Sequence, residues 1–326
     1  MMRGIFAGDA KELSVHAFGA TSSLFDMEQK DGGILRSVLK NKIGLSHRQP
    51  VPDVFPENEK YDLVAKSRKE KWAIWSLEGG LETMIDALKE DLSSKGVEFL
   101  METNVQNLNC DSKNVYLQGD NVDIQCQHSF LALPAISVAN LLQKTEMQSL
   151  NTQLLDIPYV DVAVVNIEFD GKLDLPTGEG FGLLVPSCEK RIPILGIIFD
   201  TCAFPQKTSE DLDKTVFTVM MGGRWFKKLF GPNPKESDLT NLAIYQLKSI
   251  LEIEPLIEPS RVVTKIHKNC IAQYTIGHMD RVRKIRSFIK ENNMPISLVG
   301  SAFDGVGIND AIMSSRKQIN LCDKFN

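Results

Sequence analysis

The sequence lacks several features that would assign it at once to a class of protein. No apolar run approaches the ~18 residues that a membrane-spanning helix needs. The six cysteines contain no Cys-x-x-Cys pair, and the five histidines are equally scattered, so no zinc-site spacing occurs and we expect no metal. We interpret the cysteines as buried, reduced thiols rather than a disulfide framework. Residues 1–8 predict neither a secretory signal nor a transit peptide.

A basic block of the size that binds nucleic acid is also missing. Lysine and arginine number 37 against 42 aspartate and glutamate, for a net charge of −5 over 326 residues. This balance argues against a nucleic-acid partner. Hydrophobic residues make up 43% and charged residues 24%, which is typical of a globular protein long enough for two packed domains.

The most informative absence concerns nucleotide binding. A Rossmann-type site needs a strand, a G-x-G-x-x-G turn and a helix, and no such string occurs; nor does a P-loop or a G-x-S-x-G elbow. The run Gly178-Glu179-Gly180-Phe181-Gly182 is rich in glycine, but an apolar pair follows it rather than a helical pattern. We therefore predict a loop that leads into a strand.

The residues that are present predict a mixed α/β (α+β) fold. A helix over 81–92 shows apolar residues at 3, 4 and 7 spacing, Gly96 ends it, and a short strand is expected at 97–100. Near-continuous apolar strands in the middle of the chain suggest a sheet covered on both faces. The predicted strands are 114–117, 122–125, 130–133, 160–169, 182–185, 194–199, 216–221, 261–267 and 296–300, and the later helices are 239–251, 279–292 and 307–320.

The stretch from Leu298 to Ala311 is the strongest candidate for a ligand site. A buried strand runs into small residues, then a Gly-x-Gly and a helix. Glycines allow close backbone approach, and the first helical amides are free donors at the positive end of the helix dipole. They suit an electron-rich ligand atom, such as the N1–C2=O edge of a flavin. A plain glycine-rich corner explains the residues equally well. His16 and His267 are interpreted as surface or core histidines rather than as bases.

Four stretches together resemble the protoporphyrinogen oxidase family, within the wider flavin-containing amine oxidase and phytoene desaturase group. The His-Lys-x-x-Ile-x-Gln-Tyr-x-x-Gly-His string is the most diagnostic of them. The match is collinear and covers essentially the whole chain. The stretches are Arg3–Asp9 followed by Glu12-Leu13-Ser14, Trp75–Leu81, His267–His278 and Gly300–Asp310.

The resemblance implies a set of site residues. FAD is the implied cofactor, and Val105, Ser301, Val306, Gly307 and Ile308 match family positions that contact it. The flavin performs the chemistry, so no catalytic side chain is assigned. Positions that line the tetrapyrrole cavity in the family correspond here to Phe181, Leu184 and Met220, which are aromatic or aliphatic as a flat apolar macrocycle requires.

The same resemblance implies how the chain is organised. A partial FAD-binding Rossmann-like domain is interleaved with a mixed-sheet substrate domain and a remnant of a helical membrane-docking lobe. Its expected segments are the helical remnant (1–45), a solvated linker (46–71), an FAD-domain segment (72–135), the substrate sheet (136–268) and a closing FAD-domain segment (269–326).

The resemblance also implies an activity and a location. The family oxidises protoporphyrinogen IX to protoporphyrin IX in haem biosynthesis with oxygen, releasing hydrogen peroxide. Its eukaryotic members are homodimers and monotopic proteins of the mitochondrial inner membrane. We therefore expect protoporphyrinogen IX and oxygen as partners, together with peripheral membrane contact.

Two hypotheses of function stay open. The chain corresponds to the carboxy-terminal two-thirds of the family, without the G-x-G-x-x-G unit and without the cation that holds a substrate propionate. It is either an oxidase of haem biosynthesis, or a fragment of one, or else a catalytically inactive isoform or scaffold. A related amine oxidase is disfavoured, because Phe303 is the only aromatic residue of the terminal unit.

We predict that the chain alone binds FAD poorly or not at all and is inactive, because the charge-assisted donors of the pyrophosphate cradle are missing. An absorbance spectrum of the purified chain measures this directly. A stoichiometric flavin band in the blue would contradict the prediction.

Overall fold

A computed structural model describes residues 2–15, 19–42, 62–72, 75–142, 147–175, 178, 180–189, 191–204 and 214–322. The chain divides into two compact units. One comprises Met1–Ala17 together with Glu98–Asn326, and the other comprises Phe18–Val97. Each unit is described by itself. The finer domain boundaries expected from the sequence stay a prediction.

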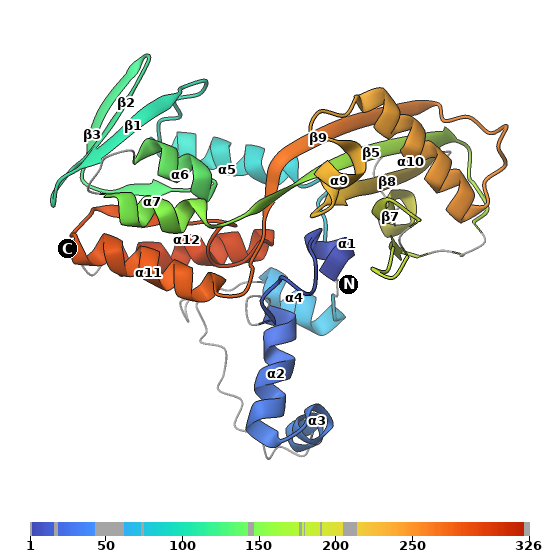
Figure 1. The fold of residues 1–326 in the computed structure, drawn as a ribbon, viewed down its shortest axis with the longest axis horizontal. Helices are drawn as coiled ribbons and strands as arrows, with labels where there is room; N and C mark the ends of the chain where they lie inside the picture. Colours follow the sequence, from blue (N-terminus) through green and yellow to red (C-terminus); the bar gives the residue numbers. More distant parts are fainter. Residues whose placement is uncertain are drawn as a thin grey trace. The chain divides into compact units, whose positions relative to one another are not determined.

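The first unit is built around a five-stranded antiparallel sheet in the order β6-β7-β8-β5-β9 (Figure 1). Its longest pairing joins β5 to β8 from Asp161↔Gly223 to Asp170↔Lys214. The sequence placed all five strands, with ends shifted by a few residues. The strands are β5 (Tyr159–Asp170), β6 (Gly182–Leu184), β7 (Ile194–Phe199), β8 (Lys214–Gly223) and β9 (Arg261–Ala272).

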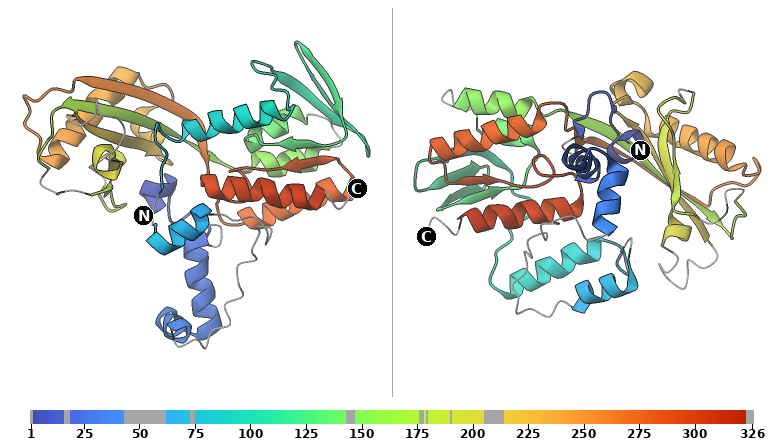
Figure 2. Two further views of the ribbon diagram at one scale, coloured as in Figure 1. Left: turned by 180° about the vertical axis from the view of Figure 1, so that it is seen from behind. Right: turned by 90° about the horizontal axis from the view of Figure 1, so that it is seen from below.

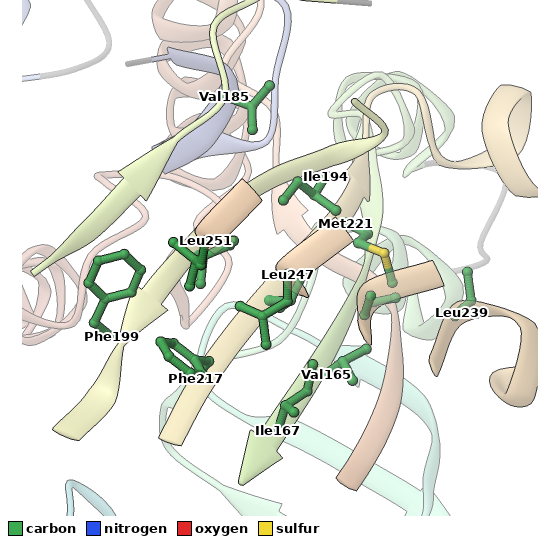
Figure 3. Close-up of a cluster of buried hydrophobic side chains, with 14 of the residues drawn as sticks. Val165, Ile167, Val185, Ile194, Phe199, Phe217, Met221, Leu239, Leu247 and Leu251 are labelled. Atoms are coloured by element: carbon green, nitrogen blue, oxygen red, sulfur yellow. The ribbon is translucent and has the colours of Figure 1, made fainter. Parts of the chain in front are cut away.

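One face of this sheet forms the main hydrophobic core. Alternate residues of β5 and β8 are fully buried there beneath helix α10 (Glu236–Leu251), because successive side chains of a strand point to opposite faces (Figure 3). Phe217 lies edge-on to both Phe169 and Phe199, with ring centroids 6.2 and 5.7 Å apart. The apolar runs of the middle strands thus reflect a sheet with one fully covered face.

The opposite face, called the open face below, is only partly covered. Helix α1 (Met2–Phe6) and Ala7 pack over one end of it, against Val160, Val162 and Leu195. The guanidinium of Arg3 secures this packing by donating hydrogen bonds of 3.0–3.2 Å to the carbonyls of Pro186, Glu189, Ile192 and Ile194. The expectation of a sheet covered on both faces was therefore correct for one face and for only part of the other.

The rest of the first unit contains two smaller sheets with helices around them. Strand β4 (Ser129–Leu131) pairs in parallel with β10 (Ile296–Leu298), although 167 residues separate Ser129 from its partner Ile296. Strand β9 runs from the large sheet directly toward α11 (Figures 1 and 2). The remaining elements are β1 (Val105–Cys110), β2 (Val115–Gly119), β3 (Val122–Cys126), α6 (Ala135–Leu141), α7 (Gln148–Leu155), α8 (Asp200–Ala203), α9 (Phe226–Phe230), α11 (His278–Glu291) and α12 (Ile308–Cys322).

The second unit consists of helices whose apolar residues are largely exposed. Helix α5 buries no residue, and Ile85 and Leu88 are 57% and 50% exposed. Helix α3 similarly leaves Leu35 and Leu39 exposed. The helices are α2 (Gly19–Asp31), α3 (Ile34–Lys42), α4 (Asp62–Glu70) and α5 (Glu82–Ser94). Residues 43–61, most of the expected linker, lie outside the described residues.

Two sequence predictions are wrong. Residues 97–100 form no strand, because no strand among the described residues pairs with them and every one of them is exposed. The cysteines are free, as expected, but none is buried: Cys188, Cys202 and Cys270 are exposed and the other three are half-buried. They lie on outer strands (Cys110, Cys126 and Cys270), in helices (Cys202 and Cys322) or in a turn (Cys188) rather than in the core. No helix in the described ranges is long and apolar enough to cross a membrane.

Candidate functional site

Three of the four sequence motifs meet in the first unit around one buried residue, Tyr274. It follows the end of β9 and is 1% exposed. Its backbone contacts the amino-terminal motif and its side chain contacts the terminal glycine corner, Gly300–Gly307. Tyr274 therefore joins segments that are far apart in the sequence.

The first of these contacts holds the amino-terminal motif. The amide of Ser14 donates to the carbonyl of Tyr274 at 2.7 Å, and the amide of Ile276 donates to the carbonyl of Glu12 at 3.1 Å. The side-chain amide of Gln273 adds a hydrogen bond of 3.0 Å to the carbonyl of Phe6. Residues 6–14 are thus fixed along the chain that leaves β9.

The second contact fixes the glycine corner. The Tyr274 hydroxyl donates to the carbonyl of Ser301 at 2.7 Å and accepts from the amide of Gly305 at 2.8 Å. Burial raises the pKa of this hydroxyl, so it stays a donor over the physiological pH range. The backbone of Gly305 has φ of +142°, and a Cβ there would overlap the side chain of Asp310, so the turn requires glycine.

His278 lies directly beneath this tyrosine. The two rings are stacked, with centroids 3.8 Å apart and an interplanar angle of 11°. His278 is fully buried, and neither ring nitrogen has a hydrogen-bond partner of ordinary geometry among the described residues. Burial, together with the nearby charge of Arg281, lowers the pKa of the imidazole to about 4. The ring is therefore neutral at pH 7 and supports Tyr274 by packing.

A half-buried ion pair supports the other side of the corner. Burial favours a protonated Asp304, but hydrogen bonds from Arg286 and Ser314 outweigh it, and the pKa of the carboxyl stays below its usual range. The Arg286–Asp304 distance is 2.6 Å. The Ser314 hydroxyl also accepts from the amide of Gly300 at 3.3 Å. Helices α11 and α12 are both tied to the corner in this way.

The corner offers backbone donors where the sequence predicted them. No hydrogen bond in the described part of the chain involves the amides of Val306 or Ile308, at the start of α12. The amide of Gly307, in contrast, makes a long hydrogen bond of 3.3 Å to the exposed carboxylate of Asp310. Free amides and a turn that only glycine can form fit the electron-rich edge of a flavin ring. This set of groups could hold that edge, but it includes no cradle for the phosphates.

The remaining cofactor residue from the sequence, Val105, lies elsewhere in the first unit. It opens β1 and pairs with Gly119 of β2. No hydrogen bond or strand pairing in the described ranges joins it to the corner. The structure thus brings together Ser301, Val306, Gly307 and Ile308, as their adjacency in the sequence requires, and leaves Val105 in a separate sheet.

Two of the three predicted substrate residues, Leu184 and Met220, lie on the open face of the large sheet. Leu184 and Met220 both lie opposite Gly196 in the strand register, so their side chains share this face. Leu184 packs against Gly4 of α1 and is 44% exposed. Phe181 precedes β6, is 51% exposed and lies edge-on to Phe204 with centroids 6.3 Å apart. Leu184 and Met220 thus form a small apolar patch, whereas Phe181 stands two residues before Leu183, which packs against the covered core.

Sequence reasoning did not assign the supporting residues Tyr274, His278, Asp304 and Arg286. The only signal was the Gln-Tyr-x-x-Gly-His string, because it places an aromatic ring and an imidazole four residues apart, across the start of a helix. His267, which precedes this string on β9, is exposed, as expected of a surface histidine. His16 lies outside the described residues. Within the described ranges, no three His, Cys, Asp or Glu side chains converge as metal ligands.

Comparison with known proteins confirms the resemblance that the motifs indicated. The chain is 33% identical over 329 residues to the human protein named protoporphyrinogen oxidase, which covers 97% of this chain and 63% of that protein. It is 22% identical over 323 residues to the coproporphyrinogen III oxidase of Bacillus subtilis (strain 168), covering 98% of this chain and 62% of the relative. The chain therefore spans less than two thirds of the length of these relatives. No protein-family model matches it.

A solved structure shares the fold over the whole chain. The crystal structure of an Exiguobacterium sp. 255-15 protein, provisionally named a protoporphyrinogen oxidase, matches 100% of this chain and 62% of its own with a TM-score of 0.77 at 23% identity. At that identity the likeness establishes the mixed helix-and-sheet architecture.

We expect Tyr274→Phe to destabilise the first unit by ~1–3 kcal/mol, because it leaves the buried amide of Gly305 and the part-buried carbonyl of Ser301 without their shared partner. Urea denaturation measures the stability, and hydrogen exchange measures opening of the corner at Gly305. Tyr245→Phe, at a position 66% exposed on α10, is the matched control. Equal stability and exchange in the two variants would show that the hydroxyl does not hold the corner.

Proposed function

We propose that this chain, a homologue of protoporphyrinogen oxidases along 97% of its length, forms the ring-facing corner and the substrate sheet of a porphyrinogen-oxidising flavoenzyme. The observation that supports this best is the 33% identity to the human protein, which extends across all the segments that meet at Tyr274.

In this proposal the amides of Val306 and Ile308 would hold the electron-rich edge of the FAD ring. When bound, the flavin supplies a hydride acceptor and the later reaction with oxygen that releases hydrogen peroxide. The side chains of this chain position the groups that hold the cofactor, rather than carry out the chemistry. Tyr274 and the Arg286–Asp304 pair hold the corner in shape, and no protein acid or base takes part.

The substrate is proposed to be protoporphyrinogen IX, oxidised to protoporphyrin IX in haem biosynthesis. The open face supplies apolar side chains through Leu184 and Met220, and Phe181 precedes β6; such side chains suit an apolar tetrapyrrole macrocycle. Coproporphyrinogen, named for the Bacillus relative, is the second candidate. We favour protoporphyrinogen because the identity to the human protein is 33% against 22%.

We further propose that the protein contacts a membrane surface peripherally, as a homodimer at the mitochondrial inner membrane. The support within this chain is helix α3 of the second unit. Its Leu35 and Leu39 are 80% and 58% exposed, and Arg36 lies on the same short helix. Exposed leucines beside a basic residue suit insertion at the headgroup boundary of a bilayer.

The activity can be tested in a chimera in which this chain replaces the aligned 63% of the human protein. We expect a flavin-loaded chimera that forms fluorescent protoporphyrin from protoporphyrinogen and oxygen. Leu184→Asp should lower kcat/KM by roughly ten-fold or more, since an unpaired carboxylate against an apolar ligand costs several kcal/mol. Leu256→Asp, at an 89% exposed position, is the control. A folded, flavin-loaded chimera without activity would refute the proposal.

Membrane contact can be tested with the purified chain and anionic phospholipid vesicles. We expect co-sedimentation that falls several-fold when Leu35 and Leu39 are both replaced by glutamate, because apolar burial drives interfacial binding. Leu256→Glu in the first unit controls for the added charge. Binding that both variants retain equally would exclude α3 as the contact.

A further inference from the structure

The open face of the five-stranded sheet contains a polar feature that the substrate residues do not explain. We propose that Lys265 and His267 of β9 form a subsite for a carboxylate of the ligand that lies on this face. The assignment rests on the proposed function and deepens it, because it names the group that would orient an apolar ring system carrying acidic side chains.

The strand register places Lys265 in line with the predicted substrate residues. Residues directly opposite one another in antiparallel strands project from the same face. One such row crosses all five strands of the sheet, from β6 to β9. It consists of Leu184, Gly196, Met220, Val164 and Lys265. Adjacent strands lie ~4.8 Å apart, so the backbone of Lys265 is about 10 Å from that of Met220.

His267 extends the polar end of this row. It pairs with Val162, on the same face as Val164, and stands two residues along β9 from Lys265. Both side chains are exposed, and among the described residues neither makes a hydrogen bond or an ion pair. An ammonium group and an imidazole side by side can both serve a carboxylate oxygen.

The acidic groups of the same face are already paired, and they lie at its other end. Glu168 forms an ion pair of 2.7 Å with Lys214. Asp200 accepts a hydrogen bond of 2.7 Å from Thr218, which in turn accepts from Asn166. The exposed Arg261 also lies directly opposite Glu168 on β9, so cationic groups offset the carboxylates at that end. Lys265 stands four residues along β9 from Arg261, away from these paired carboxylates.

The polar end of the row lies beyond the part of the face that α1 and Ala7 cover. Met220 and Val164, in the middle of the row, are half-buried and pack against the cluster of Ala7, Val160, Val162 and Leu195. Val263, two residues from Lys265 on β9, is 47% exposed. Exposed polar and apolar groups thus stand side by side at this edge, and a porphyrinogen, an apolar macrocycle with propionate side chains, supplies a matching pair of groups.

The test is a titration of the purified full chain with mesoporphyrin IX, a diacid, and separately with its dimethyl ester, followed by porphyrin fluorescence. We expect Lys265→Gln combined with His267→Gln to weaken diacid binding by about five-fold, a loss typical of an exposed ion pair, and to leave ester binding unchanged. Lys235→Gln is the matched control, because this exposed lysine immediately precedes α10 on the covered side of the sheet.

The outcomes distinguish failure of the subsite from failure of the proposed function. Diacid binding that the double variant leaves intact, or an equal loss for the diacid and the ester, would overturn the subsite alone. Failure of the unmodified chain to bind either porphyrin would overturn the porphyrinogen assignment and the subsite with it.

Discussion

The hydroxyl of Tyr274 is the interaction on which the candidate site depends. This hydroxyl, of a side chain that is 1% exposed, donates to the carbonyl of Ser301 and accepts from the buried amide of Gly305. A glycine corner has little conformational preference of its own, because glycine loses more freedom on folding than any other residue. The buried hydrogen bonds and the stacked, neutral His278 hold the corner in one conformation. The amides of Val306 and Ile308 are therefore set in position before a ligand arrives.

The two faces of the large sheet differ in how much apolar area they bury. Its α10 face is fully buried and stabilises the unit through burial of apolar area, as in the core around Phe217 and Val219. Its open face buries less and contains half-exposed apolar residues with unpaired polar groups at one edge. Side-chain alternation along β5 and β8 makes this division possible, because one strand serves both surfaces. Substitutions on the covered face should therefore change folding stability, whereas those on the open face should act on the ligand binding proposed for it.

Most of the elements could be predicted from the sequence. Apolar periodicity located α5, α10 and the strands of the large sheet within a few residues, because local pattern and burial agree there. The prediction was wrong at residues 97–100, where an apolar segment finds no partner strand. A strand depends on hydrogen bonds to another segment, and no local pattern reports whether that segment is present. The burial of the cysteines was predicted wrongly for a similar reason. Composition does not reveal which strands lie at an edge or which side of a helix is exposed.

By itself, the sequence determined the mixed fold, the resemblance to protoporphyrinogen oxidases and the glycine corner before the last helix. These features depend on residue type and local spacing, which the linear sequence contains. Only the tertiary structure decided that the amino-terminal motif, Tyr274 and Ser301 meet, that Leu184 and Met220 share a face, and that Lys265 lies in their row. Such relations arise from strand register and from contacts across hundreds of residues, because packing, rather than sequence distance, determines which groups become neighbours.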